Sequence, residues 1–150
     1  MISINANFKE KNILATITKK YNIILIYVFG SQVETAINIL KGITKIPEDR
    51  MADIDVGLVL QKKLPGPKEI FQFYSFIYNE FQELFNPFPL DLVFLQETHS
   101  VFQAQAICGE CIYSLSPSIK EKYEEDILRR AADFKPFLKM YLDEILEEVK

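Results

Sequence analysis

The sequence contains two cysteines, one histidine and no apolar run long enough to cross a membrane. Two cysteines are too few to hold together a secreted disulfide scaffold. A bilayer-spanning helix needs about 20 consecutive apolar residues, and the longest clear apolar stretch here runs only from Ile23 to Phe29. A serine-hydrolase triad would have to use His99, the sole histidine. We therefore expect neither a disulfide module, nor a membrane protein, nor a triad hydrolase.

The charge balance and the N-terminus exclude further classes. Seventeen basic and 21 acidic residues give a net charge of −4, which argues against nucleic-acid coating because such binding relies on a basic surface. The N-terminus has no signal-like hydrophobic segment, so we expect a cytoplasmic protein. At 150 residues, with 49% hydrophobic and 25% charged residues, the chain has the size of one globular domain. We expect a single domain over 1–150, with a C-terminal helical extension over 117–150.

Hydrophobic periodicity predicts a mixed α/β fold, with a small mixed sheet flanked by helices. Apolar residues recur at helical spacing or in strand-like runs, which predicts helices over 8–21, 32–41, 70–84, 98–106 and 117–150, and strands over 23–29, 53–60, 90–95 and 110–115. A polar stretch from Thr44 to Arg50 predicts a surface loop. Pro136 lies inside the last helical pattern, and because proline has no N–H we expect a kink near it.

Gly30-Ser31 lies between the first apolar strand and the following helix. A glycine at such a turn allows a phosphate to approach the backbone, and the next N–H groups point into the anion site at the start of the helix. Ser31 would add a hydroxyl donor. The alternative is ordinary turn and N-cap chemistry, which uses the same residue types.

Asp53 and Asp55 open the second strand, and residues two apart project from the same strand face. Two neighbouring carboxylates repel one another unless a cation compensates, and hard oxygen ligands suit Mg²⁺. The alternative is a solvated strand end. Asp91 lies within a third apolar strand, where a carboxylate is costly unless it is paired, bound to a metal or open to water.

Together these segments resemble the minimal nucleotidyltransferases of the DNA polymerase beta superfamily, whose signature is Gly-Ser, then Asp-x-Asp, then a third Asp on a neighbouring strand. The resemblance covers nearly the whole chain and implies a nucleotidyltransferase fold. The C-terminal helical pattern also resembles that of bacterial members often paired with HEPN-domain proteins. The segments that carry the signature are Phe29-Gly30-Ser31, Ala52-Asp53-Ile54-Asp55-Val56 and Leu90-Asp91-Leu92-Val93.

The resemblance implies a role for each motif. Asp53, Asp55 and Asp91 would be the catalytic residues and would hold two Mg²⁺ ions, with Asp91 as the general base. Gly30 and Ser31 would bind the β and γ phosphates of ATP, the nucleotide donor. The implied reaction transfers AMP onto a hydroxyl of a protein partner, a HEPN-type toxin, and the chain would act as the antitoxin.

Two departures from the family pattern keep other functions open. Glu34-Thr35-Ala36 stands where the family usually has a small residue, and Lys41 to Arg50 lengthens the connection between the first two motifs. The alternatives are a non-catalytic module that binds nucleotide or partner, and nucleotidyl transfer to a small molecule such as an aminoglycoside. The three carboxylates argue against the first, and the limited chain length argues against the second.

Two other features suggest simpler interpretations. Cys108 and Cys111 have the spacing of a zinc knuckle or a redox pair, but a structural zinc needs four ligands. We therefore expect ordinary turn and strand cysteines, and we expect His99 to start a helix.

Three aromatic residues of the helix expected over 70–84 fall partly off its apolar stripe, which predicts an exposed patch suited to a protein partner: Phe71, Phe76 and Tyr78.

Overall fold

The computed structural model describes residues 3–4, 11–43 and 52–133, and positions 140, 143, 144, 146 and 147. The elements are β1 (Ser3–Ile4), α1 (Lys11–Tyr21), β2 (Ile23–Phe29), the 3-10 turn η1 (Gly30–Gln32), α2 (Val33–Leu40), β3 (Ile54–Leu60), α3 (Ile70–Phe85), β4 (Leu90–Phe94), the 3-10 turn η2 (Leu95–Glu97), α4 (Ser100–Ile107), β5 (Glu110–Ser114) and α5 (Pro117–Ala132). The mixed α/β fold predicted from the sequence is confirmed.

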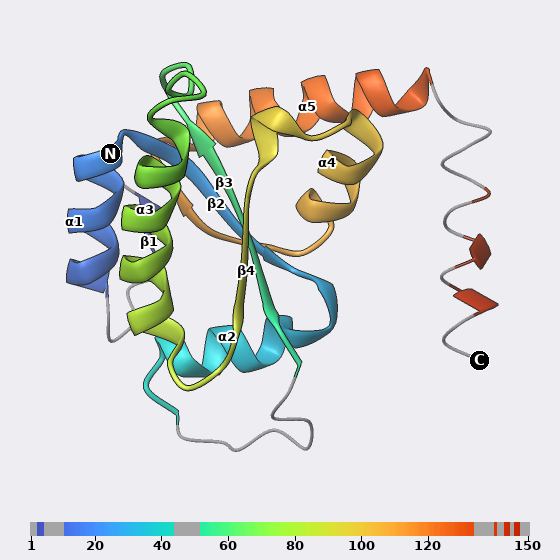
Figure 1. Ribbon diagram of the computed structural model, residues 1–150. Coiled ribbons are helices and arrows are strands. Elements are labelled where there is room, and N and C mark those ends of the chain that lie inside the picture. Colours follow the sequence, from blue (N-terminus) through green and yellow to red (C-terminus); the bar gives the residue numbers. More distant parts are fainter. Residues whose placement is uncertain are drawn as a thin grey trace.

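The strands form one mixed sheet in the order β1-β5-β2-β3-β4 (Figure 1). β2 runs antiparallel to its neighbours β5 and β3, whereas β3 and β4 are parallel. Parallel neighbours cannot be joined by a tight turn, so α3 makes the crossover between β3 and β4. The register places Asp55 of β3 opposite Phe29 of β2 on one side and opposite Asp91 of β4 on the other.

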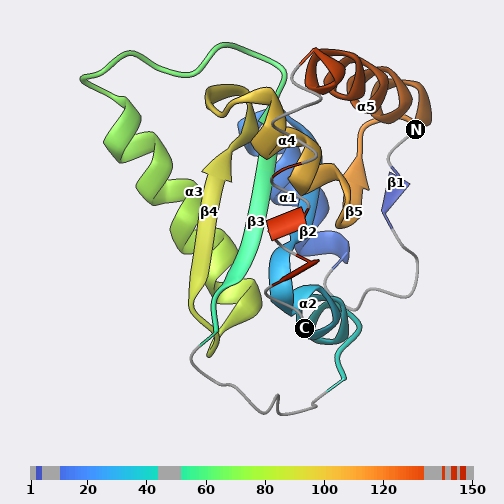
Figure 2. The same ribbon diagram turned by 90° about the vertical axis from the view of Figure 1, so that its right-hand side faces the viewer.

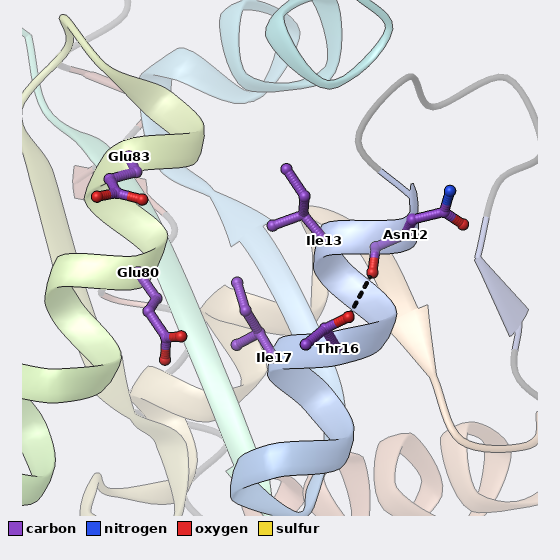
Figure 3. Close-up of a pocket in the computed structure, with 6 residues that line it drawn as sticks. All are labelled: Asn12, Ile13, Thr16, Ile17, Glu80 and Glu83. Carbon is purple, nitrogen blue, oxygen red and sulfur yellow. Dashed lines mark hydrogen bonds between the residues drawn. The ribbon is translucent and has the colours of Figure 1, made fainter.

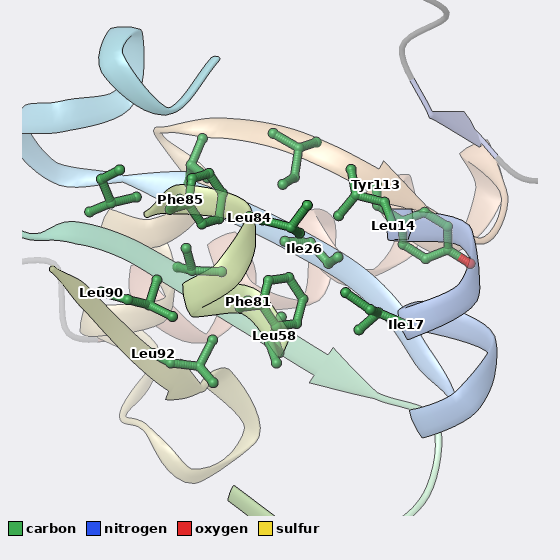
Figure 4. Packing of buried hydrophobic residues seen from close by; sticks show 14 of the residues in the cluster. Leu14, Ile17, Ile26, Leu58, Phe81, Leu84, Phe85, Leu90, Leu92 and Tyr113 are labelled. Atoms are coloured by element: carbon green, nitrogen blue, oxygen red, sulfur yellow. The ribbon is translucent and has the colours of Figure 1, made fainter. Parts of the chain in front are cut away.

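Helices cover both faces of the sheet, with α1 and α3 on one face and α4 and α5 on the other (Figure 1). Figure 2 looks onto the face that carries α4 and α5. Because successive strand residues point to opposite faces, Ile54, Val56 and Leu58 of β3 point toward α1 and α3. There they join the larger core, which includes Phe81 and Phe85 of α3 (Figure 4).

The other face of β3 changes character along its length. Val59 is buried in a second apolar cluster with Leu25 and Tyr27 of β2 and Leu95 of η2. At the opposite end of the strand, the face carries carboxylates instead of apolar side chains. The helices α4 and α5 therefore pack on the apolar half of this face and leave a polar half beside it.

The structure differs from the sequence-based prediction at element ends. β1 was not predicted, because a two-residue strand is too short to show alternation. Leu95 lies in η2 and not in the third strand, and its side chain is fully buried. The helix expected from residue 32 is preceded by the separate turn η1. The loop expected over Thr44 to Arg50 and the kink expected near Pro136 lie outside the described residues.

Helix starts agree with the sequence chemistry. Ser116 accepts a hydrogen bond from the Ile119 N–H at 3.2 Å, and Pro117 occupies the first turn of α5. His99 precedes α4, and its Nδ1 accepts from the Val101 N–H at 3.3 Å. The expectation that His99 starts a helix is therefore confirmed.

The cysteines and two of the three aromatic residues also lie where the pattern predicted. Cys108 ends α4 and Cys111 lies in β5, and both are free thiols. Phe71 and Phe76 on α3 are 80% and 54% exposed. Tyr78 differs from the expected exposed patch, because its ring is half-buried against the larger core and its hydroxyl donates to the Leu90 carbonyl of β4.

Candidate active site

Asp53 and Asp55 lie at the start of β3. Asp53 directly precedes the strand and is exposed, whereas Asp55 is its second residue and is half-buried. Between and after them, Ile54 and Val56 are 1% and 0% exposed because they point into the larger core. Strand alternation therefore holds both carboxylates on the opposite face, at the polar half described above.

Asp91 lies on the neighbouring strand β4, directly opposite Asp55 in the parallel register. Leu90 and Leu92 on either side of it are 6% and 2% exposed, while Asp91 itself is exposed. The cost of a carboxylate within an apolar strand is thus avoided by access to water. The two aspartates belong to segments 36 residues apart in sequence and meet only because β3 and β4 pair.

Gly30 brings the backbone close to this pair. It follows β2 with φ of +78°, in the left-handed region that glycine adopts without strain. A Cβ atom at this position would collide with the Asp55 carboxylate, 3.3 Å from Asp55 Cγ and nearer still to Oδ2. The Asp55 carboxylate therefore packs against the Gly30 backbone, in the space that a side chain at position 30 would occupy.

Ser31 follows within η1, and its side chain is exposed. The Gln32 amide donates a long 3.4 Å hydrogen bond to the Ser31 hydroxyl. No side chain caps the N-terminus of η1 or of α2. Uncapped N–H groups at a helix start attract anions, so this turn offers donors beside the carboxylates.

The surroundings of Asp55 disfavour its ionised form. The pKa of Asp55 is raised from its ordinary value of 3.8 to about 6. Burial is the largest cause, followed by the negative charges of Asp91 and Asp53 and a hydrogen bond to Asp91. A cation placed among these carboxylates would offset the part of this pKa shift that comes from the negative charges of Asp91 and Asp53.

The carboxylates fit a metal site that a substrate completes. Among the described residues, no three His, Cys, Asp or Glu side chains form a ready-made metal-binding group. Mg²⁺ does not require one, because it binds to one or two carboxylates and completes its shell with water and substrate phosphates. Asp55 and Asp91, with Asp53 close enough to act on Asp55 electrostatically, supply such a partial set.

Sequence reasoning missed Gly57, which shapes the same face of β3. A Cβ atom at Gly57 would lie 2.9 Å from two side-chain atoms of Leu95. The absent side chain lets Leu95 pack flat on the strand, beside the carboxylate end. Gly57 lies on the strand face opposite Ile54, Val56 and Leu58, and a glycine in a strand signals close approach of a neighbour. That signal could not identify Leu95 as the neighbour.

A hollow on the opposite side of the molecule is separate from these carboxylates. It has a volume of about 270 Å³ and lies between α1 and α3 (Figure 3). Glu80 at its edge forms an ion pair with Lys20 at 3.2 Å. Since α1 and α3 cover the other face of the sheet, this hollow takes no part in the arrangement around Asp55. Its six lining residues are Asn12, Ile13, Thr16, Ile17, Glu80 and Glu83.

A mixed sheet that brings Gly-Ser, Asp-x-Asp and a third Asp to one end defines a nucleotidyltransferase fold. The family model for "Polymerase beta, Nucleotidyltransferase" matches residues 11–118. The chain therefore belongs to the polymerase beta nucleotidyltransferase family. The match includes every residue singled out at the site, from Gly30 to Asp91.

Solved structures share the fold at low sequence identity. The chain is similar to a protein in a mutant MntA-HpeT toxin–antitoxin structure and to one in a toxin–antitoxin structure with AMP-PNP, each with a TM-score of 0.60 and 14% identity, covering 91% of this chain and 98% of the other. It is also similar to a protein in the complex of a tri-AMPylated Shewanella oneidensis HEPN toxin with its MNT antitoxin, with a TM-score of 0.55 and 13% identity, covering 91% and 96%. A search of curated proteins found no match.

The longest helices in the described part of the chain, α3 and α5, have 16 residues each. None of the helices there is both long enough and apolar enough to cross a bilayer.

Proposed function

We propose that this chain transfers AMP from ATP to a hydroxyl group of a protein partner of the HEPN toxin type, in a reaction that depends on Mg²⁺. The observation that carries the proposal is the meeting of Asp55, Asp91 and the Gly30 backbone at one end of the sheet. Family membership supports nucleotidyl transfer. The fold shared with proteins solved with AMP-PNP and with an AMPylated HEPN toxin supports the choice of donor and acceptor.

Gly30 and Ser31 bind the terminal phosphates of the donor in this proposal. Gly30 leaves its backbone open for close approach, and its positive φ turns the chain into η1. The N–H groups of η1 and the Ser31 hydroxyl then donate to phosphate oxygens. These contacts hold the β and γ phosphates, which leave as pyrophosphate when the acceptor oxygen bonds to the α-phosphorus.

The three aspartates hold the metal and the acceptor. Asp53, Asp55 and Asp91 are the ligands proposed for Mg²⁺, which when bound lowers the pKa of a coordinated hydroxyl and neutralises charge on the phosphates. Asp91, exposed on the outermost strand, accepts the proton of the acceptor hydroxyl. Asp55 lies between Asp91 and Gly30, so it joins the acceptor side of the site to the phosphate side.

Label transfer tests the proposal. The purified protein is incubated with Mg²⁺, ATP labelled at the α-phosphate and an extract of the organism that encodes it. We expect a labelled protein band that is absent with a chelator, with Asp55→Asn and with ATP labelled at the γ-phosphate. The control variant Glu121→Gln, which changes an exposed carboxylate on α5, should retain the band.

Each other outcome selects a different function. Label confined to small molecules would replace the protein acceptor by a small one. No label in an extract shown by mass spectrometry to contain a HEPN-domain protein would leave a non-catalytic binding module as the better description. Label from the γ-phosphate in the same band, lost with Asp55→Asn, would contradict nucleotidyl transfer itself.

A further inference from the structure

β4 carries Asp91 at the outer edge of the sheet. Among the described strands its one neighbour is β3, so one side of its backbone has no strand partner. The Ile54 N–H donates to the Pro89 carbonyl at 2.8 Å, and backbone groups alternate in direction along a strand. The backbone N–H and C=O of Asp91 therefore point toward β3, while the carbonyls of Leu90 and Leu92 point away from β3, toward the free edge of the sheet.

Two tyrosine hydroxyls from α3 bind these outward carbonyls. Tyr74 donates to the Leu92 carbonyl at 2.8 Å, and Tyr78 approaches the Leu90 carbonyl at 3.2 Å. Tyr78 also lies 3.2 Å from Gln82 Oε1, so its single proton is shared between two acceptors. The Tyr74 hydrogen bond is shorter and undivided, which makes it the stronger of the two.

The ring of Tyr74 is held firmly in place. It stacks on Tyr78 with centroids 5.9 Å apart and meets Phe94 edge-to-face at 5.8 Å. Burial and then the Asp91 charge raise the pKa of Tyr74, so its hydroxyl keeps its proton and stays a donor.

We propose that Tyr74 is a positioning residue for Asp91, acting by clamping the Leu92 carbonyl on the free edge of β4. The clamp fixes the strand from outside while β3 holds it from inside, so that Asp91 stays opposite Asp55. The inference rests on the proposed function in that Asp91 is taken as a metal ligand. A phenylalanine at this position would keep the ring contacts and lose only the donor.

The test compares Tyr74→Phe with the matched variant Tyr78→Phe in the full chain without nucleotide. Mn²⁺ stands in for Mg²⁺, and its binding is measured by electron paramagnetic resonance. Loss of one hydrogen bond predicts roughly three- to tenfold weaker Mn²⁺ binding for Tyr74→Phe, and less than a twofold change for Tyr78→Phe. Amide hydrogen exchange over residues 90–94 should accelerate by a similar factor in Tyr74→Phe.

The steady-state parameters of the labelling reaction distinguish a positioning role from a general loss of stability. Tyr74→Phe should lower kcat with KM for ATP unchanged, because Gly30 and Ser31 lie on the far side of Asp55. Mn²⁺ binding within twofold of the parent would overturn the proposal, and so would equal effects of the two variants. A parent protein that binds no Mn²⁺ and transfers no label would contradict the proposed function. In that case amide hydrogen exchange over 90–94 still tests whether Tyr74 holds β4 in place, and an unchanged exchange rate in Tyr74→Phe would refute this.

Discussion

Replacing Asp55 by asparagine should stabilise the metal-free protein at neutral and alkaline pH while it abolishes nucleotidyl transfer. Asp55 lies in register with Asp91 and against the Gly30 backbone, and its pKa is raised to about 6. A carboxyl group whose pKa is higher in the folded than in the unfolded state stabilises the fold when it is protonated. The contribution of Asp55 to the free energy of unfolding is therefore fully present below the unfolded pKa of 3.8 and is lost as the pH rises through about 6.

The magnitude follows from this shift. A change from 3.8 to about 6 corresponds to ~3 kcal/mol, and solvent screening at a half-buried group reduces it to ~1 kcal/mol. Asparagine carries no charge, so Asp55→Asn should gain ~1 kcal/mol over the parent at pH 8, or about 2–4 °C in Tm. The gain should shrink to a small fraction by pH 4 and vanish further below 3.8, where Asp55 is protonated in both states.

Thermal unfolding in a chelator between pH 4 and 8 measures this gain. Excess Mg²⁺ should then raise Tm of the parent and leave Asp55→Asn unchanged, because a ligand stabilises only a state that binds it. Glu121→Gln serves as the control and should follow the parent under both conditions. A variant no more stable than the parent at pH 8, or a gain as large at pH 4 as at pH 8, would refute the assignment of a raised pKa to Asp55.

Three further variants test the packing around the site and the core. Gly30→Ala should cost ~1–3 kcal/mol in chemical denaturation and abolish ATP binding, because of its positive φ and the collision with Asp55. Gly66→Ala is the neutral control, since a Cβ there would come no nearer than 4.0 Å to Glu69 Oε2, and equal effects of the two variants would contradict this reasoning. Gly57→Ala should cost ~1–3 kcal/mol by crowding Leu95, and Leu95→Val added to it should restore part of the loss. Phe81→Ala, fully buried, should cost ~3–5 kcal/mol, whereas Phe76→Ala, 54% exposed, should change the free energy of unfolding by no more than ~0.5 kcal/mol.

The sequence was sufficient to predict most of the fold because its elements have strong local signals. The run from Ile23 to Phe29 and the three- and four-residue spacing from Ile70 to Leu84 each match one element closely. β1 escaped prediction since two residues carry no periodicity. Leu95 was assigned to a strand because its apolar side chain continues the pattern, although its backbone turns into η2.

At the site, the motifs predicted which residues meet but not what holds them. Gly30, Asp55 and Asp91 come together as the motif order suggested. From its helical spacing, Tyr74 was expected to be an ordinary core residue of α3. That spacing does not show that β4 is an edge strand whose free carbonyl the Tyr74 hydroxyl can bind. That information depends on strand order, a property of the whole chain that no local pattern contains.

The strand order also has a consequence for synthesis of the protein. β2 pairs with β3 soon after both leave the ribosome, but its other neighbour, β5, begins about 80 residues later. At ~5–20 residues per second, this strand waits ~4–16 s with one edge unpaired. The waiting strand is apolar or aromatic throughout and four of its residues are β-branched, a composition prone to pairing between chains. The risk of aggregation is therefore concentrated in the nascent chain, and slow translation between β3 and β5 prolongs it.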